Sequence, residues 1–246
     1  MKTSKYQRRF YRDWVAEKDL YSLRIQDRES DLFILCDRPI DQGFIKDRLR
    51  SYRFDIERYI DKDRRFLTSL KPVPVELAAP EIVREMADAA KKANVGPMAA
   101  VAGAIAEFLG RDLLKNSCRQ VIIENGGDIF LKSTKVRNIG IYSGKSRLWK
   151  GLCLKIRPKD TPLGICTSSG TIGHSLSFGQ ADSAVLLCRK ASLADAVATA
   201  VCNRICGKKD LQEAIEFAKK VKGVVGIILI FKNTLASWGK IEFSRR

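Results

Sequence analysis

The sequence predicts an α+β fold in which a mostly antiparallel sheet packs against helices. Strand-like segments occur in neighbouring pairs joined by short polar turns, which is typical of antiparallel hairpins. Helical segments also occur in consecutive pairs and do not alternate strictly with strands, as they would in a parallel sheet. No linker composition divides the chain, so we expect a single domain over residues 1–246.

The first third of the chain predicts an arm, a hairpin and a long helix. Aromatic residues are interleaved with arginines over residues 1–18, which favours an arm or edge strand over a base-stacking surface. Residues 20–26 and 32–36 are predicted strands around a charged turn. Apolar residues recur every three or four positions between Ile40 and Leu70, which predicts an amphipathic helix.

The middle of the chain predicts two helices and a strand. Pro80 is expected at the first position of a helix that ends near Ala93. Residues 98–114 are alanine-rich and apolar on nearly every side, which predicts a buried helix; Gly103 within it indicates a close approach by a backbone or a ligand. Residues 120–131 predict a strand that contains two adjacent glycines, interpreted as a bulge or a close backbone approach.

The last part predicts a basic hairpin over residues 132–159 and then a Gly/Ser/Thr-rich segment over residues 164–182. Ser192 is the expected N-cap of the helix that follows the next strand. The remaining elements are a strand, two helices and a strand, over residues 184–189, 193–206, 210–222 and 224–231.

Composition limits the class of protein. The chain has 246 residues, 45% of them apolar, which is enough for a substantial core. No apolar run reaches the roughly 18 residues that span a bilayer, and no apolar stretch follows the basic start, so we expect a cytoplasmic protein without a membrane partner. The seven cysteines contain no C-x-x-C pair, which favours buried free thiols, although a helix would bring Cys202 and Cys206 together.

The net charge of +17 is concentrated in one segment, residues 131–160, which holds nine basic side chains and one acidic side chain. Such a segment attracts the phosphates of a nucleotide or nucleic acid, or an acidic partner protein. A solvated hairpin face is the simpler explanation. A non-enzymatic binding module that uses this segment is therefore the second functional hypothesis.

The Gly/Ser/Thr-rich segment is the most distinctive polar stretch. It places the hydroxyls of Thr167, Ser168 and Ser169 beside Gly170 and close to the only histidine, His174. Backbone N–H groups and hydroxyls can approach a small polar ligand where glycines remove side-chain bulk. A loop that joins two strands would have the same composition.

Three motifs occur in order: Asn125-Gly-Gly-Asp128, Thr167-Ser-Ser-Gly170 with His174, and Ala194-Asp-Ala-Val-Ala-Thr199. Together they resemble the FAD:protein FMN transferases of the ApbE-like superfamily. The resemblance covers roughly residues 95–232 and leaves residues 1–72 as a divergent part. Two further stretches are similar to a family of shorter ApbE-like proteins from archaea and bacteria: Gly96-Pro-Met-Ala-Ala-Val-Ala-Gly103 and Thr171-Ile-Gly-His-Ser175.

The resemblance implies an ApbE-like fold, a phosphate-bearing ligand such as FAD or another nucleotide, Mg²⁺, and transferase activity. It implies that Asp195 and Thr199 hold the metal, since carboxylate and hydroxyl oxygens suit this cation. On their own, these two residues would be a first-turn acid and a packing threonine. It also implies a catalytic His174 that assists proton transfer. The implied ligand-binding residues are Gly126, Gly127, Asp128, Thr167, Ser168, Ser169 and Gly170.

The sequence departs from the transferases at two motifs. Ala102 stands where they have a lysine before Gly103, and Ser175-Leu-Ser-Phe-Gly179 replaces the D-P-x-T-G that follows their histidine. The resemblance therefore implies the fold more strongly than the reaction. A homo-oligomer is left open.

Overall fold

The structure is a computed structural model that describes residues 19–141, 148–149, 151–170 and 179–245. The arm expected over residues 1–18 lies outside the described residues, as does His174. Within the described part no single helix is long and apolar enough to cross a membrane, although the helical segments Glu81–Ala93 and Pro97–Lys115, bent by 103°, together meet the length and composition criteria.

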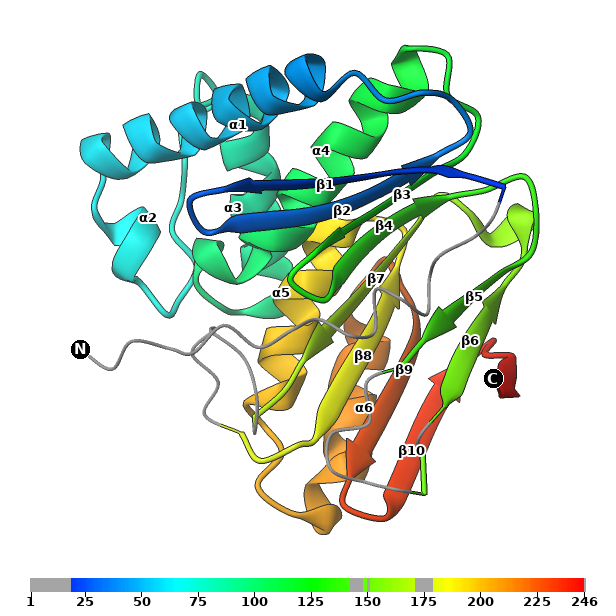
Figure 1. Ribbon diagram of the computed structural model, residues 1–246. Coiled ribbons are helices and arrows are strands. Elements are labelled where there is room, and N and C mark those ends of the chain that lie inside the picture. The colour runs from blue at the N-terminus through cyan, green and yellow to red at the C-terminus, as the bar shows by residue number, and fades with distance from the viewer. Residues whose placement is uncertain (1–18, 142–147, 150, 171–178, 246) are drawn as a thin grey trace.

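An eight-stranded sheet forms the centre of the fold, in the order β1-β2-β3-β4-β7-β8-β9-β10, and every neighbouring pair is antiparallel (Figure 1). The strands are β1 Tyr21–Asp27, β2 Ser30–Cys36, β3 Val121–Asn125, β4 Asp128–Lys132, β7 Leu163–Ser168, β8 Ser183–Cys188, β9 Val224–Phe231 and β10 Thr234–Gly239. This confirms the predicted fold class. Strand β2 pairs with β3, so the N-terminal hairpin belongs to the same sheet as the later strands.

A second sheet covers part of one face of the first. It contains β11 Phe243–Arg245, β6 Leu152–Ile156 and β5 Arg137–Gly140, in that order. Aliphatic side chains from both sheets, including Leu131, Leu154 and Ile228, form one buried cluster. The basic hairpin is therefore confirmed, with its aliphatic side facing inward.

Helices cover the other face of the large sheet and enclose the main core (Figure 1). They are α1 Gln42–Lys62, α2 Arg65–Thr68, α3 Glu81–Ala93, α4 Val101–Lys115, α5 Ala191–Cys202 and α6 Leu211–Lys220, with short 3₁₀ turns at Pro97–Ala100, Pro158–Asp160 and Lys208–Asp210. The single helix predicted over residues 40–70 is two helices, because the chain is extended at Asp63.

The two adjacent glycines form a hairpin turn and not a bulge. Gly126 has φ of 70° and Gly127 has φ of 107°, and they join β3 to β4, in which Asn125 pairs with Asp128. Positive φ at both central residues is the conformation of the type I′ turn, which twists as the strands do. The prediction of one interrupted strand over residues 120–131 was wrong for this reason.

The prediction for α5 was wrong at both ends. Ser192 is not the N-cap but lies buried inside the helix, where its hydroxyl donates to Glu85 Oε1 at 2.9 Å. The helix ends at Cys202, so Cys206 falls beyond it. Cys202 is buried and Cys206 is exposed, so the two thiols do not share a helix face.

Two C-terminal strands were not predicted. Residues 234–239 and 243–245 form β10 and β11, beyond residue 231, where the last expected strand ends. Most of the β10 side chains are half-buried, and this edge strand shows no clear alternation of apolar and polar residues. The periodicity that reveals buried strands is therefore weak in this segment.

Candidate functional site

Helix α5 is buried along its length except at two positions. Asp195 and Thr199 are half-buried, whereas every other residue of the helix is buried. Residues four apart lie on one face of a helix. The predicted metal-binding pair therefore lies on the one strip of α5 that is not fully buried.

Asp195 contacts the start of the neighbouring helix α4. Its Oδ2 atom accepts a hydrogen bond of 2.9 Å from the backbone N–H of Gly103. A Cβ atom on Gly103 would lie 2.3 Å from the carbonyl oxygen of Ala191 and 2.9 Å from the Cβ of Asp195. The close approach predicted at Gly103 is therefore that of a second helix, and Asp195 has a structural role as well as any role in binding.

Asp128 lies beside Asp195 from a different element. It is buried at the start of β4, and its Oδ1 accepts a hydrogen bond of 3.3 Å from the backbone N–H of Thr167. Desolvation raises the pKa of Asp195 well above its usual value, and the negative charge of Asp128 raises it further, against the lowering effect of the Gly103 N–H. Two carboxylates thus share one partly enclosed place.

The thiol of Cys166 belongs to the same cluster. Cys166 is buried in β7, and its Sγ atom donates to the carbonyl oxygen of Ala191 at 3.3 Å. Burial raises its pKa well above the usual value, and the charges of Asp128 and Asp195 add to this effect. These contacts favour the neutral thiol form of Cys166.

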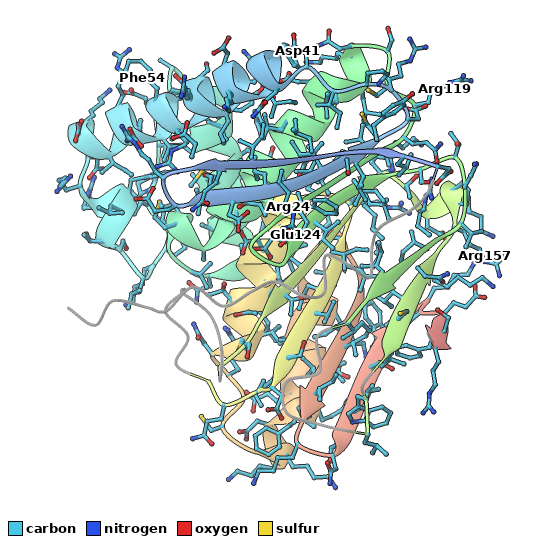
Figure 2. The ribbon with its side chains drawn as sticks, in the orientation of Figure 1. Arg24, Asp41, Phe54, Arg119, Glu124 and Arg157 are labelled. Atoms are coloured by element: carbon cyan, nitrogen blue, oxygen red, sulfur yellow. The ribbon has the colours of Figure 1, made fainter. Side chains whose placement is uncertain are left out.

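The β3–β4 turn is tied to the start of α4. Asn125 Nδ2 donates to the carbonyl oxygen of Ala102 at 3.2 Å, and Glu124 Oε1 accepts from the Gly127 N–H at 2.7 Å. These contacts fix the turn from which Asp128 continues. Arg24 of β1 and Glu124, both labelled in Figure 2, are each paired with Phe33 of β2, so they lie in register two strands apart on the same face of the sheet.

The Thr167–Gly170 stretch ends β7 and is half-buried. The Gly170 N–H donates to the carbonyl oxygen of Ala181 at 2.9 Å. A Cβ on Gly170 would lie 1.9 Å from the carbonyl oxygen of Gly179, and a Cβ on Gly179 would lie 1.7 Å from that of Cys202. The two described ends of the Gly/Ser/Thr-rich segment therefore close against each other and against the C-terminal end of α5.

The two carboxylates can hold a cation only if a bound phosphate and water supply the remaining oxygen ligands. Among the described residues, no three His, Cys, Asp or Glu side chains are grouped so as to hold a metal ion. Mg²⁺ in proteins is commonly held by one or two carboxylates, while phosphate oxygens and water complete its octahedral shell. Asp128 and Asp195 match this donor set.

A cavity of about 450 Å³ opens beside the start of α4. Ala102 and Asn125 line it, so it adjoins the β3–β4 turn. Its apolar wall consists of Ile56, Ile60, Leu67, Met98, Val101 and Ile105. Two ion pairs lie at its polar side, Arg28–Glu57 at 3.0 Å and Arg53–Glu29 at 2.5 Å.

Several cations of the basic segment already have acidic partners. Lys135 and Arg137 pair with Asp19 at 2.6 and 2.8 Å, and these contacts hold the pKa of Asp19 far below its usual value, with the hydrogen bond from Arg137 as the largest cause. Lys155 and Arg157 pair with Glu242 at 2.7 and 2.8 Å. Four of the nine basic side chains of this segment are therefore ion-paired within the fold, two to each carboxylate.

Three residues that position the site were not predicted from the sequence: Glu107, Glu124 and Asn125. Glu107 accepts a hydrogen bond of 2.7 Å from the Ala191 N–H at the start of α5. Glu107 and Asn125 act through backbone groups 84 and 23 residues away, whereas Glu124 acts within the turn itself. A glutamate in an apolar helical segment was the one available signal for Glu107.

The fold is ApbE-like. The flavinyl transferase ApbE of Pseudomonas stutzeri, in its apo form, has a TM-score of 0.58 to this chain at 10% identity and covers 89% of this chain and 94% of its own. The flavin transferase ApbE of Vibrio cholerae has a TM-score of 0.56 at 14% identity and covers 89% and 96%.

The chain belongs to the family described as AbpE bacteria, whose model matches residues 12–234. A UPF0280 protein of Methanocaldococcus jannaschii is 42% identical over 229 residues, which are 90% of this chain and 91% of that protein. A UPF0280 protein of Methanococcus vannielii is 38% identical over 227 residues, 91% and 92% of the two chains. The resemblance drawn from the three motifs is confirmed.

Proposed function

We propose that this protein binds a phosphate-bearing small molecule, a flavin nucleotide such as FAD, together with Mg²⁺, and transfers part of that molecule. The proposed metal ligands are Asp195 and Thr199, with Asp128 beside them. The proposed ligand contacts come from the β3–β4 turn and the end of β7: Gly126, Gly127, Asp128, Thr167, Ser168, Ser169 and Gly170.

The neighbouring carboxylates of Asp128 and Asp195 carry the proposal. Two such groups close together in a desolvated place favour a bound proton or a bound cation. The half-buried strip of α5 leaves the cluster open on one side. A bound Mg²⁺ would neutralise the charge of a phosphate there. The names of the two structural neighbours, both flavin transferases, support a flavin as the ligand.

The cavity beside Ala102 supports a ligand with a ring system. Its volume of about 450 Å³ lies within the usual range of small-molecule pockets. The ion pairs Arg28–Glu57 and Arg53–Glu29 leave its polar side with little net charge. An uncharged ring is therefore a better occupant than a phosphate, which would lie toward Asp195.

Transfer is a separate part of the proposal. His174 remains the proposed proton-transfer residue and lies outside the described residues. Ala102 supplies no cation where the transferases have a lysine, and its carbonyl oxygen is used by Asn125. Binding and transfer must therefore be measured separately.

Titration calorimetry with FAD, with and without MgCl₂, tests the binding. We expect Mg²⁺-dependent binding to the natural protein that is weakened at least tenfold in Asp195→Asn, because one cation ligand loses its charge. Asp210→Asn is the matched control, since Asp210 Oδ2 also accepts backbone N–H groups, from Cys206 and Gly207, but lies at another helix start. Equal affinities in all three proteins, or binding indifferent to Mg²⁺, would refute the proposal.

A further inference from the structure

One peptide group lies between the proposed metal site and the cavity. It is the bond between Ala102 and Gly103, in the first turn of α4. The Gly103 N–H donates to Asp195 Oδ2 at 2.9 Å, and the Ala102 carbonyl oxygen accepts from Asn125 Nδ2 at 3.2 Å. The C=O and N–H of a peptide share one rigid plane, so the two contacts act on a single unit.

The two partners of this peptide come from different parts of the site. Asp195 is the proposed metal ligand on α5. Asn125 lines the cavity, as Ala102 does, and only 6% of its surface is exposed. Asn125 also pairs with Asp128 across the β3–β4 turn. Hydrogen bonds therefore lead without a gap from the proposed metal ligand to the cavity wall.

The start of α4 depends on these contacts because it has no side-chain cap of its own. Ala100, the N-cap residue, makes no side-chain capping hydrogen bond. The first N–H groups of a helix have no acceptor within the helix, so other parts of the chain must accept them. Asp195 does this for Gly103. How firmly Asp195 is held therefore affects how firmly one wall of the cavity is held.

We propose that Asn125 is a positioning residue, through which a metal ion at Asp195 strengthens the binding of a ring in the cavity. This rests on the proposed function, which assigns the metal to Asp195 and the ring to the cavity. A cation on one carboxylate oxygen would fix the Asp195 side chain and leave Oδ2 on the Gly103 N–H, because hydrogen-bonded neighbours orient metal ligands. The Ala102 carbonyl then stays in place for Asn125, and the ring meets a wall that is already ordered.

The coupling has a definite sign and is reciprocal. Ordering the first turn of α4 costs conformational entropy, and the first ligand to bind bears that cost. The second ligand then binds more tightly. Mg²⁺ and the ring should each raise the affinity of the other by the same factor, at least about fivefold, which is the lower end of the usual coupling between two sites.

Fluorescence titration of the full chain with lumiflavin measures the coupling. Lumiflavin is a flavin ring without the ribityl chain and phosphates, so no phosphate of the probe can bridge to the metal. The ratio of its affinities with and without MgCl₂, at equal ionic strength, is the coupling factor. We expect a factor of at least about five in the natural protein.

Three variants locate the coupling. In Asn125→Ala the dependence on Mg²⁺ should disappear, whereas a merely structural loss would weaken lumiflavin binding equally with and without Mg²⁺. Ser30→Ala is the matched control and should keep the dependence: Ser30 lines the same cavity, but its Oγ accepts from Arg53 Nη1 at 2.9 Å. Asp195→Asn should bind lumiflavin without any effect of Mg²⁺, which tests the coupling from the other end if Asn125→Ala does not fold.

Hydrogen exchange gives a readout that needs no ring. Mg²⁺ alone should slow exchange of the Gly103 N–H in the natural protein and leave it unchanged in Asp195→Asn, because only the natural side chain offers both a charge for the cation and an acceptor for this N–H. Exchange that Mg²⁺ does not change in the natural protein would contradict the proposal.

The coupling is overturned if lumiflavin does not bind or binds equally well with and without Mg²⁺. It is also overturned if Asn125→Ala keeps the full factor, because the ring and the metal would then interact directly. The FAD titration tests the proposed function separately. FAD binding that needs Mg²⁺, together with lumiflavin binding that is indifferent to it, would leave the proposed function standing and remove the coupling.

Discussion

Asp195 and Glu107 cap each other's helices. Asp195 of α5 accepts the Gly103 N–H in the first turn of α4, and Glu107 of α4 accepts the Ala191 N–H in the first turn of α5. Glu107 lies four residues after Gly103 in α4, and Asp195 lies four residues after Ala191 in α5. The two contacts therefore join the helices in antiparallel orientation. Each carboxylate offsets the positive end of the other helix and satisfies a buried N–H group.

The Glu107 cap should be important for stability. Glu107→Ala leaves the buried N–H of Ala191 without its acceptor, at a cost of about 2–3 kcal/mol, and Glu107→Gln should cost less because an acceptor remains. Urea unfolding at pH 7 measures the difference. Glu216→Ala, which removes an exposed ion pair with Lys219, is the control and should stay within about 0.5 kcal/mol. Equal losses in the alanine variants would contradict the cap.

Asp195 should make stability depend on pH. Desolvation and the charge of Asp128 raise its pKa in the folded protein, so its contribution is fully present below the unfolded pKa, near 3.8, and is lost as the pH rises toward the folded pKa. In metal-free buffer, Asp195→Asn should therefore gain stability relative to the natural protein between pH 4 and pH 8, since asparagine can still accept the Gly103 N–H. Thermal unfolding across this range measures the difference, and parallel curves would contradict it.

Gly103 should not accept a side chain. Gly103→Ala would place a Cβ at 2.3 Å from the Ala191 carbonyl oxygen, so α4 and α5 must separate, which we expect to cost about 1–3 kcal/mol or more. Gly43→Ala, also in a helix, meets only Asp41 Oδ1 at 3.2 Å and should be nearly neutral. Denaturant unfolding of both variants compares the two costs. A neutral Gly103→Ala would mean that the helices are less closely packed.

The two glycines of the β3–β4 turn should differ in how much stability is lost when each is replaced. Gly126 has φ of 70°, which asparagine tolerates, so Gly126→Asn should be mild. Gly127 has φ of 107°, where a side chain is strained, so Gly127→Ala should cost about 1–3 kcal/mol. Both free energies of unfolding follow from denaturant titration. Equal costs would exclude this turn geometry.

The basic segment should behave as part of the fold more than as a nucleic-acid surface. Glu242→Gln removes the partner of Lys155 and Arg157 and frees their charges. We expect any binding of single-stranded DNA to the natural protein to have a shallow salt dependence that steepens in this variant. Fluorescence anisotropy across a salt series measures the slope. A steep slope in the natural protein would favour the binding module.

Periodicity in the sequence was enough to predict the N-terminal hairpin, the basic hairpin and most helices, because side-chain spacing reflects burial on one face. It could not locate the start of α5, since Ser192 has the local features of an N-cap while the actual acceptor, Glu107, is 84 residues away. Asp195 and Thr199 were proposed as metal ligands from the resemblance, since their spacing alone fits an ordinary helix. The structure adds that Asp195 and Thr199 are the two half-buried positions of α5.

The most direct test of the proposed site is anomalous diffraction from crystals grown with FAD and Mn²⁺, which prefers the same oxygen ligands as Mg²⁺. The account predicts a manganese peak between the Asp195 carboxylate and the FAD phosphates, with Asp128 beside it, and no such peak in Asp195→Asn crystals. Bound FAD with its metal elsewhere, or a peak unchanged by Asp195→Asn, would contradict it.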